Sequence, residues 1–417
     1  MSDGVLAYQT GHGPSYNDKV CSRCMGHRAL CGVRPCPIVM RAVTLARIDE
    51  RMSGNALSGS SPPGVFVGSY GYPQVLVGPL IPPLRGPEVT LMERPDLWLD
   101  KTLDEIMALR FNLVRTKRSI RVESAVDPPR VLAETQTLVL SDSPADTEAT
   151  LLKRPQFTSI FTRGMLPIGP SAPLEQFRLD DNPHVHPSVD RVTSDTDMRA
   201  ADGVMALFRD RIDVQHIVRL FSVGLIGQNR SRRLVPTEWS ITAVDDIIGR
   251  RLHRQILDLD WISDYEVYAS HALGNTVVVL MSPGAWQYEA LECWLMGPRT
   301  NVISDHEHTK GRSSYASSVV GAYYAARLPV LEHLHNNRRQ ASVIVFLEID
   351  PKQWLPLGVW RFREIARRAL RDGPRRFSTL RDAIIGVSSH LRAPIEAYLR
   401  RSALFEGLDS QTQLTEY

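Results

Sequence analysis

The chain has 417 residues, 43% of them hydrophobic and 23% charged, and its formal net charge is +3. This composition excludes a disordered chain, a collagen and a small disulfide-rich scaffold. No apolar run approaches the roughly 18 residues of a membrane-spanning helix, and residues 1–19 lack the apolar core of a signal peptide, so we expect a cytoplasmic protein without a membrane partner.

Four of the five cysteines lie close together near the start of the chain, at Cys21, Cys24, Cys31 and Cys36. Thiolates at this spacing can surround one metal ion, and four cysteine ligands leave no open position, which is typical of a structural zinc site. An iron–sulfur cluster is the alternative, because proline follows the last cysteine, as it does in some cluster proteins. His27 lies between the pairs and is either a substitute for one thiolate or, as we favour, a bystander, and cysteines without any metal are the remaining alternative.

Up to residue 195 the expected elements are short, and the apolar spacing of the chain predicts them in this order: helix 38–52, loop 53–64, β-like runs 65–67 and 75–77, and helices 103–114 and 130–140.

Beyond residue 195 the expected elements are longer. They are helices 200–223 and 242–257, strands 265–270, 276–281 and 288–294, helix 313–336, strand 342–349, and Arg-rich helices to residue 405. The three consecutive strands predict an antiparallel meander, because their connections are too short for crossover helices.

The predicted fold class is therefore α+β: a mixed core with an antiparallel sheet and flanking helices, plus a small N-terminal four-cysteine zinc finger. We divide the chain into four parts. They are the zinc-binding segment 1–52, two parts of the core at 53–195 and 196–405, and a tail at 406–417.

The tail ends in Gln411, Leu414 and Tyr417, which are spaced three residues apart. In a 3₁₀ turn such side chains project from one side, so one amide and two hydrophobic groups can enter an apolar pocket. This arrangement resembles the clamp-binding peptide (PIP motif) of proteins that dock on the sliding clamp PCNA. That motif usually carries a second aromatic residue, whereas this chain stops after the first.

The two ends together resemble the archaeal Nre family of DNA repair proteins, and the resemblance continues through five internal segments. These are Gly68-Ser69-Tyr70-Gly71-Tyr72-Pro73 with Val77-Gly78-Pro79-Leu80, residues 234–246, Lys310-Gly311-Arg312-Ser313-Ser314-Tyr315-Ala316, Tyr323-Tyr324-Ala325-Ala326-Arg327-Leu328, and Pro356-Leu357-Gly358-Val359-Trp360. The resemblance implies a role in the response to DNA damage that acts through the clamp. It implies no particular reaction.

A candidate anion site precedes the helix 242–257. Arg232 and Arg233 lie before it, and Thr237 or Ser240 can cap a helix that starts near Ile241. A phosphate can bind there, with the nearby Trp239 available for stacking on a base. The alternative is an ordinary helix cap with solvated arginines.

A second candidate site is catalytic and would use a divalent ion. Asp245 and Asp246 supply carboxylates, further carboxylate and imidazole groups come from a loop at residues 305–308, and Lys310 and Arg312 can grip a phosphate. With Mg²⁺ or Mn²⁺ this set would suit a nuclease. The alternative is an acidic loop without catalytic function.

Residues 361–376 carry seven arginines against two acidic residues. Such a segment can follow a DNA backbone through Arg361, Arg367 and Arg368, or it can be a solvated helix face.

The interpretation that unites these features is a DNA repair factor that docks on PCNA and binds or acts on damaged DNA. Two alternatives stay open: a non-catalytic adaptor between the clamp and other repair proteins, and a nucleotide-directed enzyme.

Overall fold

The computed structural model describes residues 36–157, 169–295, 301–350 and 357–405, together with residues 23, 24, 28 and 30. These residues belong to two compact units, an N-terminal unit that ends at Ile247 and a C-terminal unit that begins at Ile248. The boundary falls inside one continuous helix, α9 (Thr237–Ile256). Within the described ranges, no helix is both long and apolar enough to cross a membrane.

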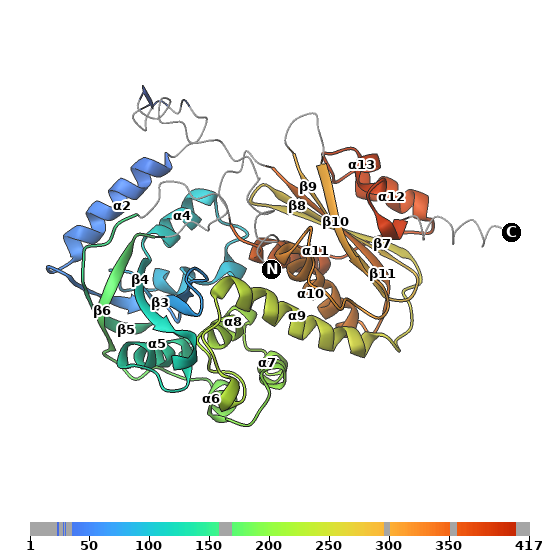
Figure 1. Ribbon diagram of the computed structural model, residues 1–417. Coiled ribbons are helices and arrows are strands. Elements are labelled where there is room, and N and C mark those ends of the chain that lie inside the picture. The colour runs from blue at the N-terminus through green and yellow to red at the C-terminus, as the bar shows by residue number, and fades with distance from the viewer. Residues whose placement is uncertain are drawn as a thin grey trace. The chain divides into compact units, whose positions relative to one another are not determined.

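The N-terminal unit contains one sheet and several helices (Figure 1). Its strands are β1 (Ala56–Ser61), β2 (Val65–Val67), β3 (Gln74–Ile81), β4 (Val114–Arg121), β5 (Ala145–Leu151) and β6 (Ser171–Leu179). Its helices are α2 (Pro37–Arg51), α3 (Glu88–Leu91), α4 (Leu103–Phe111), α5 (Arg130–Leu140), α6 (Pro187–Ser194), α7 (Ala200–Arg209), α8 (Val214–Ser222) and the first part of α9, with 3₁₀ turns η2 (Pro95–Leu97), η3 (Val122–Ala125) and η4 (Asn229–Ser231).

The sheet of the N-terminal unit has the strand order β1-β5-β6-β4-β3-β2. Its neighbouring strands are antiparallel except for β4 and β6, which are parallel. Alternate residues of β5 are buried, so one face of the sheet forms a core with α2 and α5 and the other face is more open. This alternation is the pattern of a half-buried strand.

The C-terminal unit contains a second sheet with helices on both faces. Its strands are β7 (Tyr265–Ala272), β8 (Asn275–Ser282), β9 (Gln287–Trp294), β10 (Asn301–Glu307), β11 (Ser342–Ile349) and β12 (Arg375–Phe377). Its helices are the second part of α9, α10 (Gly321–Asn336), α11 (Trp360–Asp372), α12 (Leu380–Ser388) and α13 (Ile395–Leu399).

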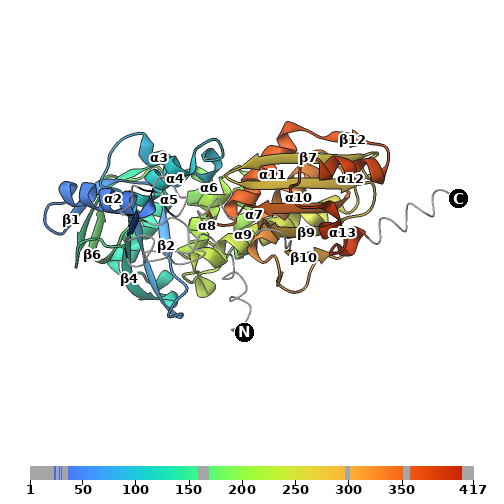
Figure 2. The same ribbon diagram turned by 90° about the horizontal axis from the view of Figure 1, so that it is seen from above.

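Helices α10 and α11 lie on one face of this sheet and α12 and α13 on the other (Figure 1). Every residue of β8 and of β11 is buried, which explains why both read as uninterrupted apolar runs. Seen from above, β12 and β10 lie at opposite edges of the sheet, as the strand order β10-β9-β11-β8-β7-β12 requires (Figure 2).

The predicted mixture of sheet and flanking helices is confirmed, but the predicted antiparallel meander is wrong. Strands β7 and β8 do pair antiparallel, whereas β11 lies between β8 and β9 and runs parallel to β9. Both sheets are therefore mixed. The physical reason is that α10 provides the long crossover that a parallel pair needs, and the most apolar strand takes the central position.

The zinc finger of the predicted fold class stays a prediction. Cys21 and Cys31 lie outside the described residues, while Cys24 is buried and Cys36 directly precedes α2.

Candidate nucleic-acid interface

Exposed aromatic rings meet at the start of α9. The helix begins at Thr237, whose hydroxyl accepts a hydrogen bond from the backbone N–H of Val67 in β2 at 3.0 Å. Trp239 therefore lies beside the turn between β2 and β3, and its ring centroid is 5.5 Å from that of Tyr72. Trp239 is 46% exposed and Tyr72 50%, and Tyr70 in the same turn is 92% exposed. Rings that are open to solvent in this way offer surfaces for base stacking.

Two exposed arginines lie in segments that adjoin these rings. The backbone N–H of Leu234 donates to the carbonyl of Val122 at 2.9 Å, so Arg233 comes close to the end of β4. Arg121, the last residue of β4, forms a 3.3 Å ion pair with Glu123. The pKa of Glu123 is lowered, first by its own backbone N–H and then by Arg121 and Arg233. The surface thus carries positive charge, partly balanced by Glu123, as well as aromatic rings.

Arg232 lies on the inside of the same segment. Its residue is 9% exposed, its Nε donates to the carbonyl of Gly227 at 2.8 Å, and its Nη2 donates to the carbonyls of Thr193 and Asp195. Burial lowers the pKa of its guanidinium. Arg232 therefore anchors the loop before α9 to the end of α6, and its predicted contact with phosphate stays a prediction.

The predicted cap at Ser240 is wrong. Helix α9 begins at Thr237, directly after Pro236, so Ser240 lies in the first helical turn. Its buried hydroxyl donates to the carbonyls of Pro236 and Val235, at 3.2 and 3.3 Å. A proline is well suited to the position just before or at the start of a helix, and this moves the start upstream of the predicted one.

The acidic group at residues 305–308 is not a loop, because Asp305 and Glu307 belong to β10. The carboxylate of Asp305 accepts hydrogen bonds from three successive backbone N–H groups of residues 317–319 and pairs with Arg312 at 3.1 Å. Arg312 also donates to the carbonyls of His306, Ser314 and Tyr315. These contacts fold the segment 308–319 onto the end of β10.

The members of the predicted catalytic set lie in different units. Asp245 is buried and Asp246 half-buried in the part of α9 that belongs to the N-terminal unit. Lys310, which is exposed, and Arg312, which is half-buried, belong to the C-terminal unit. Within the described ranges, no group of three or more His, Cys, Asp and Glu side chains is arranged as metal ligands are. Their joint action stays a prediction.

A buried ion pair that the sequence analysis did not identify joins α10 to β10 in the C-terminal unit. The guanidinium of Arg327 in α10 contacts Glu307 Oε1 at 2.7 and 2.8 Å, and the side chains are 3% and 2% exposed. The indole N–H of Trp286 donates to the same oxygen at 3.0 Å. This network joins α10 to β10.

The arginines at residues 361–376 make contacts within the protein. Arg361 donates to Asn275 Oδ1 at 3.0 Å, Arg367 forms a bidentate pair with Glu332, and Arg368 donates to Ser270 Oγ. These three side chains are only partly exposed, so much of the positive charge of α11 serves packing. Their predicted DNA contacts stay predictions.

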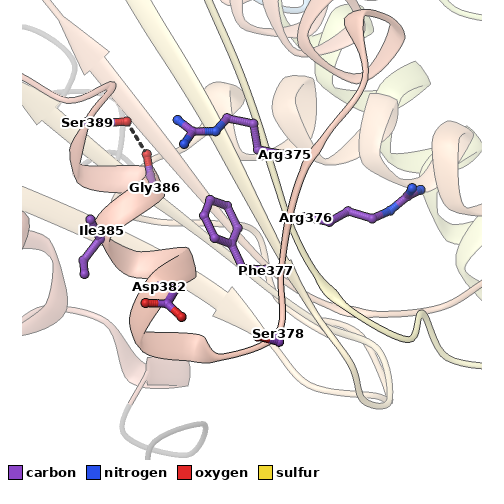
Figure 3. Close-up of a pocket in the computed structure, with 8 residues that line it drawn as sticks. All are labelled: Arg375, Arg376, Phe377, Ser378, Asp382, Ile385, Gly386 and Ser389. Atoms are coloured by element: carbon purple, nitrogen blue, oxygen red, sulfur yellow. Dashed lines mark hydrogen bonds between the residues drawn. The ribbon is translucent and has the colours of Figure 1, made fainter.

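Arg375 and Arg376, at the end of this segment, border a shallow pocket between β12 and α12 (Figure 3). Arg376 pairs with Glu266 at 3.0 Å, while the guanidinium of Arg375 lies 5.5 Å from the ring centroid of Phe377. Phe377 fills the space beside Gly386, where a Cβ atom would approach the ring to 2.5 Å. Phe377 and Gly386 thus form one wall of the pocket, and Arg375 beside them stays exposed.

The predicted clamp-binding residues, Gln411, Leu414 and Tyr417, lie outside the described residues.

Comparisons with known proteins cover both units. The family profile described as Archaeal Nre, N-terminal, matches residues 30–299, and the profile described as Archaeal Nre, C-terminal, matches residues 307–417. The chain belongs to the archaeal Nre family. The resemblance inferred from the sequence motifs is thereby confirmed.

Three curated Nre proteins are similar over most of their length. DNA repair protein NreA of Archaeoglobus fulgidus is 35% identical over 88% of this chain and 93% of its own. DNA repair protein NreB of the same organism is 32% identical over 92% and 96%, and DNA repair protein NreA of Haloferax volcanii is 32% identical over 89% and 91%. No solved structure matches the chain.

Two features of the N-terminal sheet escaped the sequence analysis. The contact of Tyr72 with Trp239 has no signal in residue spacing, because the two segments are distant in sequence. Strand β4 does have a signal, since Arg115, Lys117, Ser119 and Arg121 share one phase of the strand period, while Val114, Thr116 and Ile120 share the other, which only Arg118 interrupts.

Proposed function

We propose that this Nre protein is a DNA repair factor that binds DNA and docks on PCNA through its C-terminal peptide. The observation that carries the proposal is the similarity, over about nine-tenths of the chain, to proteins named for DNA repair. Coverage of this extent includes both compact units, so the proposal concerns the whole protein rather than a shared module.

The surface around Trp239 supports the DNA-binding part of the proposal. It combines three exposed aromatic rings with the exposed Arg121 and Arg233. Aromatic stacking tolerates any base sequence but needs bases that are not paired inside a duplex, so single-stranded or locally opened DNA is the expected ligand.

Two sequence features support the docking part of the proposal: the four cysteines near the N-terminus and the spacing of Gln411, Leu414 and Tyr417. A four-cysteine zinc site near the N-terminus would stabilise a segment that has too few apolar residues to fold by itself. A clamp-binding tail beyond residue 405 would hold the protein on DNA that is being replicated or repaired, because tethering raises the local concentration.

Fluorescence anisotropy tests the DNA-binding part. Labelled oligonucleotides, one single-stranded and one duplex, are titrated with the full-length protein at several salt concentrations. We expect tighter binding of the single strand and an affinity that falls with salt, because cations are released from the phosphates. Affinity for neither DNA, with clamp binding retained, would favour the adaptor instead.

A pull-down with the PCNA of the same organism tests the tail. Replacing Leu414 and Tyr417 with Ala should abolish capture, because both hydrophobic contacts are lost. The matched control replaces Thr412 and Thr415, which lie between the contact positions, and should be captured like the wild type. Equal capture of both variants would rule out the clamp-binding peptide.

A further inference from the structure

Two basic side chains of β4 lie on the same face of the N-terminal sheet. Arg115 and Lys117 are two residues apart in the strand, so both point to the side opposite to Val114, which belongs to the core. Arg115 is 7% exposed, and its guanidinium carbon lies 4.5 Å from the ring centroid of Phe66. It pairs across the sheet with Leu80, which belongs to an apolar cluster with Met92 and Leu113.

Neither cation has a counterion in the described part of the chain. Arg115 Nε is buried and makes no hydrogen bond, and no described carboxylate forms an ion pair with Arg115 or Lys117. Burial lowers the pKa of Arg115. The pKa of Lys117 is lowered to about 8, mainly by burial and to a smaller extent by the charge of Arg115. The two cations therefore repel each other in a partly dry environment.

Four other buried arginines of this protein have carboxylate or carbonyl partners within the protein. Arg219 contacts Glu93, Arg327 contacts Glu307, and Arg363 contacts Glu364, while Arg232 donates to three backbone carbonyls. An unpaired buried charge costs stability, and Arg115, unlike these four arginines, has no carboxylate or carbonyl partner among the described residues, which leaves it for a partner from outside. The partner must be an anion.

We propose that Arg115 and Lys117 form a binding site for a phosphate group on the open face of the N-terminal sheet. Lys117 is half-buried and supplies the accessible charge. Arg115, which is buried two residues earlier in the same strand, supplies the second charge. The hydroxyl of Ser119 and the amide of Gln74, which are hydrogen-bonded at 3.0 Å, continue the polar row along the same face. Phosphate oxygens accept several charge-assisted hydrogen bonds at once, which suits two adjacent cationic donors.

The identification of this phosphate as part of a DNA strand rests on the function proposed above. Affinity for phosphate itself does not depend on that function. The two statements can therefore fail separately.

Protection of lysines from an acylating reagent, read by mass spectrometry at pH 7.5, tests the site in the full-length protein. The probes are pyrophosphate, an oligothymidylate with a 5′-phosphate and the same oligothymidylate without it. We expect each bound phosphate to slow the acylation of Lys117 by about fivefold or more, because a nearby anion favours the protonated amine. The exposed Lys153 of the same unit is the internal control and should react unchanged.

Variants provide the matched comparison. Lys117→Met should weaken binding of the oligothymidylate by about tenfold, the usual effect of one lost charge-assisted hydrogen bond. Lys117→Arg should restore most of the affinity, and Lys153→Met should change it by less than about twofold. A purely structural role of Lys117 would not be sensitive to the charge of the replacement.

The outcomes separate the two proposals. Protection by pyrophosphate alone supports the phosphate site and overturns DNA as its source. Protection by both oligonucleotides identifies a backbone phosphate, and protection by the 5′-phosphorylated one alone identifies a strand end. DNA binding without any protection of Lys117 overturns the site and leaves the proposed function standing.

Discussion

The ring of Tyr72, in the turn between β2 and β3, lies against the ring of Trp239 in the first turn of α9, with 5.5 Å between the centroids. The hydrogen bond from the backbone N–H of Val67 to the Thr237 hydroxyl holds the two segments together. Both rings keep about half of their surface exposed, although burial would stabilise them, which indicates a surface kept for a ligand.

Replacing Trp239 with Ala should weaken binding of single-stranded DNA by about 1–3 kcal/mol, the usual contribution of one base–aromatic stack. Trp261 of the C-terminal unit is 57% exposed and provides the control, since its replacement with Ala should leave the affinity unchanged. Anisotropy titrations measure both. An equal loss in the two variants would mean that Trp239 acts through general stability and not through stacking.

Arg115→Met should have opposite effects on stability and on binding. Without phosphate, the free energy of unfolding should rise by about 1 kcal/mol, because methionine fills similar space without an unpaired buried charge. Affinity for pyrophosphate should fall at the same time. Urea denaturation and calorimetric titration measure the two quantities. A variant that is less stable than the wild type would show that Arg115 is structural.

Arg327→Met should be destabilising by about 3–5 kcal/mol, in contrast to Arg115→Met. Its loss leaves the carboxylate of Glu307 buried at 2% exposure, with the indole N–H of Trp286 as one remaining donor. Urea denaturation of the single variant and of Arg327→Met with Glu307→Gln measures this effect. The double variant should recover part of the loss, and no recovery would contradict the assignment of the cost to the unpaired charge.

His216 should make the protein less stable in acid. It is buried in α8, its Nε2 is 2.8 Å from the carbonyl of Val139, and burial, with the charge of Arg219 second, lowers its pKa to about 4. Between pH 6.5 and pH 4 His216 binds a proton in the unfolded chain but stays neutral in the folded chain. The free energy of unfolding therefore falls as the pH falls from 6.5 toward 4. The change amounts to about 3 kcal/mol over this range.

Comparison of urea denaturation at pH 7 and pH 5 for wild type and His216→Gln measures this contribution. The glutamine amide can still donate to the carbonyl but does not titrate, so its loss of stability should be smaller than that of the wild type. Identical losses would assign the acid sensitivity to the carboxylates.

Binding at the phosphate site should weaken above pH 8 rather than near the ordinary lysine pKa of about 10.4. The lowered pKa of Lys117 means that the folded protein loses this charge first, at about pH 8. Calorimetric titrations with pyrophosphate from pH 7 to pH 9.5 measure the change. Lys117→Arg should keep its affinity over this range, and the same decline in that variant would point to another group.

The sequence by itself determined those features that depend on neighbouring residues. The apolar runs at 276–281 and 342–349 correspond to β8 and β11, because strands with two buried faces need uninterrupted apolar residues. Motifs along the chain were enough to indicate the Nre family. The predicted helix 103–114 corresponds to α4, which the capping box of Thr102 and Glu105 begins.

Only the tertiary structure decided which distant segments meet. The position of β11 between β8 and β9, the contact of Tyr72 with Trp239 and the absence of a described counterion for Arg115 all depend on pairings between residues far apart in the chain. Local periodicity carries no information about such pairings, because they are selected by the burial of whole faces. The charge of a side chain can be read from its residue type, but its cost depends on what surrounds it in the folded protein.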